Sequence, residues 1–204
     1  MARIRLRPKY SEEELKQVYS NPHDSSTWID HRLRVPASLT MCKWALAEFG
    51  DGPDNTVADL SCGDGSIMLG LLSWVGGYAP RSIVADYNMD PDLEVEFSGY
   101  TVLRNGPIEE NLHSVDKVTL FVLSETLEHL DDPDSVLASI RSKSKILFLS
   151  TPNGEKTDAN PEHYWGWELE DIRAMLHDTG WTPRAYQIMA FPNITDGFQL
   201  WVAT

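Results

Sequence analysis

Two acidic residues and a histidine near the middle of the chain have the types and the spacing to do chemistry together. Glu125, Glu128 and His129 follow an apolar run, and they share one helical face if a helix begins where that run ends. Two carboxylates and an imidazole can hold a divalent cation, and such oxygen-rich sites suit Mg²⁺ or Mn²⁺. A metal at this point would lower the pKa of a substrate hydroxyl and make it a nucleophile.

Simpler interpretations of these residues stay open. Glutamate and histidine near a helix start often form only a solvated or capping cluster. His129 is alternatively a general base without metal, or a hydrogen-bonded core histidine. Further along, His163 lies in the segment 161–167 and is a fourth candidate ligand.

A second candidate site is the glycine-rich turn in VADLSCGDGS, residues 57–66. Gly63 and Gly65 allow the backbone to turn tightly and to approach a ligand without a Cβ in the way. Asp86 ends the next predicted strand, where a carboxylate accepts hydrogen bonds from ribose hydroxyls. The turn therefore predicts a nucleoside site, and a tight turn beside a solvated aspartate is the alternative.

The details of the turn decide which nucleoside it fits. A dinucleotide fingerprint has a third glycine where this chain has Met68. Asp59 and Asp64 are unfavourable beside a pyrophosphate, but they are compatible with a cationic sulfonium ligand.

The elements that must position these residues alternate between strand and helix. Helices are predicted at 11–19, 36–49, 66–74, 132–142 and 169–180, and strands at 56–61, 81–86, 100–105, 117–124, 145–151, 181–190 and 198–204. Such alternation predicts an α/β fold with a mostly parallel, doubly wound sheet. Ligands bind such sheets at the carboxyl ends of the strands, near Ser61, Asp86, Asn105 and Ser124.

The sequence DLSCGDG, residues 59–65, resembles the D-L-G-C-G-x-G motif of class I S-adenosylmethionine-dependent methyltransferases, and the resemblance runs from about Thr56 to Thr204. It implies a Rossmann-like, seven-stranded sheet whose last strand is antiparallel, with S-adenosylmethionine as cofactor. Ser61 stands where glycine is usual. The cofactor-binding residues that it implies are Asp59, Ser61, Gly63, Gly65, Asp86, Gly106, Pro107, Ile108 and Ser124.

A narrower resemblance concerns E-x-x-E-H at 125–129, T-P-N-x-E at 151–155 and the histidine with aromatic residues at 163–167. Together they are similar to the metal-dependent 2′-O-methyltransferases that act on the 3′ end of small RNAs. The first motif is also similar to ubiquinone-biosynthesis O-methyltransferases. The resemblance implies a divalent ion, Mg²⁺ or Mn²⁺, held by Glu125, Glu128, His129 and His163, with the first three as catalytic residues.

Size and charge limit the partners. The chain has 204 residues and a net charge of −14, so its surface repels phosphate backbones and disfavours duplex DNA. Two cysteines make no disulfide framework, and no signal peptide or membrane-spanning run is evident, so we expect a cytoplasmic protein. We expect a helical cap at 1–50 and one catalytic domain at 51–204. The oligomeric state is left open.

Three functions follow from these patterns. The first is methylation of a hydroxyl on a small molecule or glycan, the second is 2′-O-methylation of RNA, and the third is a catalytically silent partner subunit. Arg32 or Arg34 would lie near the cofactor carboxylate, unless the pair is only a solvated face. Trp28, Tyr164, Trp165 and Trp167 either wall the acceptor site or belong to the core.

Overall fold

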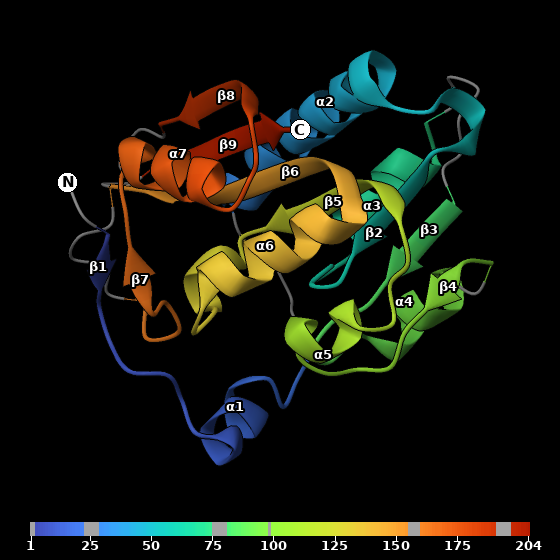
Figure 1. Cartoon of the computed structure of the whole chain (residues 1–204). Helices are drawn as coiled ribbons and strands as arrows, with labels where there is room; N and C mark the ends of the chain where they lie inside the picture. The colour runs from blue at the N-terminus through green and yellow to red at the C-terminus, as the bar shows by residue number, and fades with distance from the viewer. Residues whose placement is uncertain (1–2, 23–28, 75–80, 98, 155–159, 191–196) are drawn as a thin grey trace.

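The computed structural model describes residues 3–22, 29–74, 81–97, 99–154, 160–190 and 197–204. Its centre is a seven-stranded sheet (Figure 1). The strands are β2 (Thr56–Asp59), β3 (Arg81–Val84), β4 (Thr101–Val102), β5 (Val118–Ser124), β6 (Ser144–Asn153), β8 (Pro183–Met189) and β9 (Gly197–Ala203). They lie in the order β4-β3-β2-β5-β6-β9-β8.

Strand directions confirm the predicted fold class. The strands from β4 to β6 are parallel neighbours, whereas β9 runs antiparallel to both β6 and β8. This is the Rossmann-like α/β sheet with an antiparallel last strand that the sequence predicted. Among the described residues, no helix is long and apolar enough to cross a membrane.

Helices cover both faces of the sheet (Figure 1). They are α1 (Glu12–Val18), α2 (Ile29–Phe49), α3 (Ser66–Leu72), α4 (Pro91–Glu96), α5 (Ile108–Leu112), α6 (Pro133–Lys143) and α7 (Leu169–Asp178), with short 3₁₀ helices at η1 (Gly52–Asp54) and η2 (Leu127–His129). Alternate β5 side chains enter different cores: Leu120 packs with α2 and α3, and Phe121 packs with α6 and α7. A strand buried on both faces explains the unbroken apolar run in the sequence.

Helix α2 begins earlier than the sequence predicted. It starts at Ile29, and Pro36 lies in its interior rather than at its start. The added turns carry the exposed side chains of Ile29 and Leu33, so they show no buried apolar stripe from which a helix is predicted.

A small second sheet lies apart from the large one and was not predicted. It consists of β1 (Ile4–Arg5) and β7 (Trp165–Gly166), which pair antiparallel (Figure 1). Two-residue strands have no periodicity that a sequence pattern can reveal. The pairing brings the first residues of the chain to the segment that contains His163.

Candidate active site

A cavity of about 610 Å³ opens at the carboxyl ends of the central strands, where an α/β sheet binds its ligands. Most of the predicted site residues line it: Asp59, Ser61, Gly63, Asp86, Gly106, Pro107, Ile108, Ser124, Glu125, Glu128, His129 and His163. Gly65 is not among the lining residues. It has φ 73°, a backbone conformation that strains any side chain, and a Cβ there would also lie 2.7 Å from Leu93 Cδ1, so this position requires glycine mainly for the turn.

The glycine-rich turn is bonded directly to the strand-terminal aspartate. The amide of Gly63, a residue with φ 56°, donates to Asp86 Oδ2 at 2.7 Å. Ser61, where the related motif has glycine, is not among the described residues with positive φ. Its amide donates to Asp59 Oδ1 at 3.1 Å, and its hydroxyl accepts from Thr126 Oγ1 at 2.8 Å. The serine is therefore accommodated without left-handed backbone.

Asp59 lies beneath this turn with almost no exposure. Its pKa is raised to about 8: burial is the main cause, the hydrogen bond from the Ser61 amide opposes it, and the nearby charge of Asp86 contributes to the rise. The carboxyl group is thus largely neutral near pH 7. A cationic ligand in the cavity would favour its charged form.

Glu128, His129 and His163 come together at the other end of the cavity. One ligand atom from each lies within 4.8 Å of the others, which is close enough to share an ion. Glu128 Oε2 accepts from Thr151 Oγ1 at 2.9 Å, whereas buried Oε1 has no hydrogen-bond partner among the described residues. Burial raises the pKa of Glu128 to about 8, and the charge of Glu125 adds to the shift.

The orientation of His129 is fixed by the backbone. Its Nδ1 lies 3.1 Å from the Glu162 carbonyl oxygen, which can only accept a hydrogen bond. Nδ1 therefore carries a proton, so that in the neutral ring the lone pair is on Nε2, which lies 4.0 Å from Glu128 Oε1. A backbone carbonyl behind a ligand histidine is a common arrangement in metal sites.

Glu125 lies outside this cluster. The prediction that it shares a helical face with Glu128 and His129 is wrong, because its backbone is left-handed at φ 50° and only Leu127–His129 form a short 3₁₀ helix. Its Oε1 accepts from Ser150 Oγ at 2.7 Å. Burial raises its pKa, and the charge of Arg34 opposes this. Its role as a metal ligand stays a prediction.

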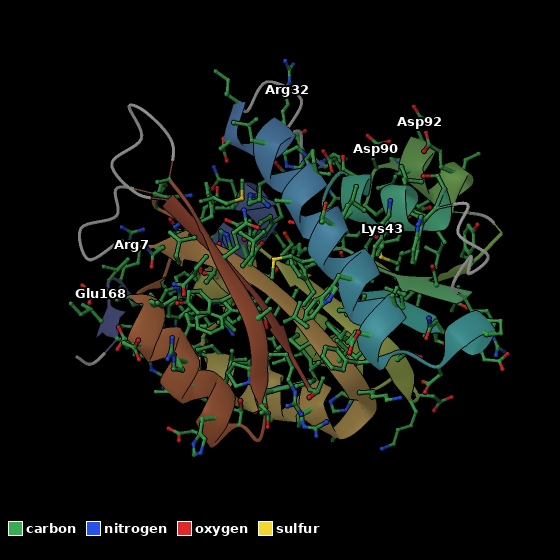
Figure 2. The ribbon with its side chains drawn as sticks, turned by 90° about the horizontal axis from the view of Figure 1, so that it is seen from above. Arg7, Arg32, Lys43, Asp90, Asp92 and Glu168 are labelled. Atoms are coloured by element: carbon green, nitrogen blue, oxygen red, sulfur yellow. The ribbon has the colours of Figure 1, made fainter. Side chains whose placement is uncertain are left out.

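Arg34 is the partner of Glu125. Its Nη1 lies 3.8 Å from Glu125 Oε1 and donates to Ser124 Oγ at 3.2 Å. The guanidinium lies 5.0 Å from the centre of the Phe198 ring. It is only 5% exposed, and its Nε has no hydrogen-bond partner among the described residues. Arg32 does not line the cavity, and Figure 2 shows it projecting at the outer end of α2.

Several lining residues were missed by the sequence analysis. Tyr19 packs on Tyr87 with ring centres 4.9 Å apart, and Asn88 Nδ2 donates to the Tyr19 carbonyl at 3.0 Å. Burial raises the pKa of Tyr19, and the charge of Glu162 adds to the shift. Tyr87 and Asn88 directly follow Asp86, close to the carboxyl end of a strand. Residues at such ends line the ligand site in this kind of sheet, so their position could have identified them. Tyr19 is the C-cap residue of α1, and no local sequence pattern marks it.

The predicted aromatic wall is only partly present. Tyr164 lines the cavity, but Trp165 and Trp167 do not. Trp167 is in the core and donates to Thr151 Oγ1 at 3.0 Å, and Trp165 donates to the Leu130 carbonyl at 2.9 Å. Trp28 and Glu155 lie outside the described residues.

No protein-family model matches the sequence, and no curated protein matches it. Solved structures do. A Burkholderia thailandensis 1,6-didemethyltoxoflavin-N1-methyltransferase with bound S-adenosylhomocysteine has a TM-score of 0.71 at 16% identity, over 98% of this chain and 93% of that one. Magnesium protoporphyrin IX methyltransferase from Synechocystis has a TM-score of 0.65 at 15% identity, over 94% and 92%.

A third similar structure is a SAM-dependent methyltransferase from Archaeoglobus fulgidus, with a TM-score of 0.58 at 17% identity over 88% of this chain and 99% of that one. At sequence identities this low, the structural similarity establishes the fold alone. The chain has the fold of class I S-adenosylmethionine-dependent methyltransferases.

Proposed function

We propose that the protein is a methyltransferase that binds S-adenosylmethionine in this cavity. The observation that carries the proposal is the hydrogen bond from the Gly63 amide to Asp86, beyond the carboxyl ends of the adjacent parallel strands β2 and β3. It joins the glycine turn, which faces the methionine part, to the carboxylate that receives the ribose. Gly106 to Ile108 line the same cavity on the adenine side.

Arg34 would bind the carboxylate of the cofactor. It is buried and lines the cavity, and its Nε has no hydrogen-bond partner among the described residues, so the guanidinium can donate to a further carboxylate. A different nitrogen of the group, Nη1, is the one that lies 3.8 Å from Glu125 Oε1.

Isothermal titration calorimetry with S-adenosylhomocysteine tests the cofactor assignment. Asp86→Asn should weaken binding by about 1–3 kcal/mol, the cost of a lost charge-assisted bond. Asp90→Asn is the matched control, because Asp90 is exposed, caps α4 and does not line the cavity. Tight binding of NAD or ATP with none of S-adenosylhomocysteine would refute the assignment.

The acceptor in this proposal is a hydroxyl group, activated beside Glu128, His129 and His163. One carboxylate and two imidazoles suit Mn²⁺ better than Mg²⁺, which prefers oxygen ligands. Glu128 Oε1 has no hydrogen-bond partner among the described residues and lies 4.0 Å from Nε2 of His129, whose ring is oriented by a backbone carbonyl. A metal held there supplies Lewis acidity that lowers the pKa of an acceptor hydroxyl. Without a metal, His129 is positioned to take the proton itself.

A small molecule or glycan is the acceptor that the charges favour. Nine carboxyl side chains line the cavity, which disfavours a phosphate backbone: Asp30, Asp59, Asp64, Asp86, Glu109, Glu125, Glu128, Asp131 and Glu162. RNA remains the second candidate, on the strength of its motif resemblance alone. Residues 1–50 would act as a cap on the cavity, since Tyr19 and Arg34 both line it.

Transfer of a labelled methyl group from S-adenosylmethionine to catechols, monosaccharides and a short single-stranded RNA separates these acceptors. Chelation with EDTA should abolish transfer and leave S-adenosylhomocysteine affinity unchanged, and Mn²⁺ should restore activity. Transfer that survives chelation but not His129→Ala assigns His129 as a general base instead. His177→Ala is the control, because His177 is exposed on α7.

A further inference from the structure

The first residues of the chain form an arm against the segment that supplies His163. In the arm, Ile4 pairs with Gly166 and Arg5 pairs with Trp165 (Figure 1). The Leu6 amide donates to the Tyr164 carbonyl at 2.8 Å. We call residues 3–10 the arm. It follows the segment 164–166 and reaches the cavity, which Lys9 lines.

A side chain of the arm bonds to the backbone of His163. Arg7 Nη1 donates to the His163 carbonyl at 2.9 Å, across 156 positions of sequence. Beyond it, Tyr10 bonds at both ends: its amide donates to Tyr164 Oη at 3.1 Å and its hydroxyl to the Pro161 carbonyl at 2.7 Å. These bonds hold the segment 161–166 on both sides of His163.

The opposite side of the same segment is bonded to η2, which carries Glu128 and His129. The Tyr164 amide donates to the Glu128 carbonyl at 2.8 Å. His129 Nδ1 donates to the Glu162 carbonyl. The segment therefore lies between the arm and η2, and the position of His163 relative to Glu128 depends on both.

We propose that the arm is a positioning element of the acceptor end of the cavity, acting on His163 through Arg7 and the β1–β7 pairing. The inference rests on the proposed function, which assigns Glu128, His129 and His163 to acceptor activation. A misplacement of about an ångström is enough to impair such a site. The cofactor end is built from β2, β3 and β5. Within the part of the chain that the structure describes, the arm makes no hydrogen bond or ion pair to the cofactor residues named above, so its removal should affect the two ends unequally.

The test compares the affinities for two probes in the full-length chain: Mn²⁺, measured by electron paramagnetic resonance, and S-adenosylhomocysteine, measured by calorimetry. Arg7→Ala should weaken Mn²⁺ binding by about tenfold, the usual effect of losing a group that orients a ligand. Arg7→Lys should partly restore it, and removal of residues 2–8 should weaken it further. Arg184→Ala is the control, because Arg184 is exposed on β8.

S-adenosylhomocysteine affinity should change by less than about twofold in every variant, since these residues orient a ligand and do not bind the nucleoside. Unchanged Mn²⁺ affinity in both Arg7→Ala and the deletion would overturn the inference. Equal weakening of both probes would also overturn it, because the arm would then act only on overall stability.

A wild-type protein that binds S-adenosylhomocysteine but not Mn²⁺ would refute the metal and still decide the inference. The imidazole proton signal of His163, assigned with His163→Gln, should then shift in Arg7→Ala while that of exposed His177 stays in place. An unmoved His163 signal would overturn the positioning role.

Discussion

Glu125 and Glu128 show how the surroundings separate residues of one type. They stand three positions apart, yet Glu125 lies beside a guanidinium and Glu128 beside two imidazoles. The sequence predicted both as site residues from their spacing with His129 after a strand, and both line the cavity. It did not separate them, since the left-handed backbone at Glu125 arises from the fold around it.

Arg34 offers a prediction at the scale of one functional group. Arg34→Met should weaken S-adenosylhomocysteine binding by about 1.5–3 kcal/mol, the range for a hydrogen bond to a charged group. It should leave 5′-methylthioadenosine, which lacks the amino-acid part, within about 0.5 kcal/mol of wild type. Calorimetry on both ligands checks this, with Arg32→Met as the control. An equal loss for both ligands would mean that Arg34 only shapes the cavity.

Asp59 predicts how stability depends on pH. Its folded pKa of about 8 lies above the ordinary value of 3.8, so the folded state keeps a proton that the unfolded state loses. Stability from this group is therefore present below pH 4 and is lost as the pH rises toward 8, by up to about 1.4 kcal/mol per pH unit. Urea unfolding from pH 5 to 8 should show a flatter decline in Asp59→Asn. Parallel curves would contradict the buried, protonated carboxyl.

At the scale of elements, the strands of the large sheet, the helices α3, α6 and α7 and the later part of α2 were predictable, because they bury continuous apolar runs or faces. The two-residue strands β1 and β7 and the short helices α4 and α5 were not, since each depends on its neighbours for stability. The same distinction applies to the site. The turn at Gly63 has a local signature, whereas Tyr19 and Arg7 reach their positions only through tertiary contacts.

Helix α1 also depends on tertiary contacts for its position. It begins with a Ser11–Glu14 capping box, but none of its residues is buried. Tyr19, at its end, packs on Tyr87 beside Asp86 and lines the cavity. Bound S-adenosylhomocysteine should therefore slow amide exchange in 11–19 by about tenfold, because it adds packing to a weakly held element. Hydrogen-exchange mass spectrometry measures this, and α6 should be unaffected. Equal exchange with and without ligand would remove α1 from the cap.

At the scale of the molecule, an acidic chain surrounds an acidic cavity. The net charge is −14, and nine carboxyl side chains line the cavity, where Arg34 already lies beside Glu125 and Lys9 is the other lining side chain with a permanent positive charge. S-adenosylmethionine carries a sulfonium charge that S-adenosylhomocysteine lacks. Raising NaCl from 50 to 300 mM should therefore weaken the former by about two- to fivefold more than the latter, through screening. An identical salt response would place the sulfonium away from these carboxylates.

The left-handed backbone at Glu125 also bears on how this position can evolve. Glycine, asparagine and aspartate adopt φ 50° at least cost, and β-branched residues adopt it worst. Glutamate costs more free energy in this conformation than those residues do, so selection for stability alone would replace it. In a library with every residue at position 125, variants can be ranked by protein abundance. Glycine and asparagine should rank above glutamate, and valine and isoleucine should rank lowest. A ranking by function that instead favours glutamate would measure how much stability this chain gives up for its carboxylate.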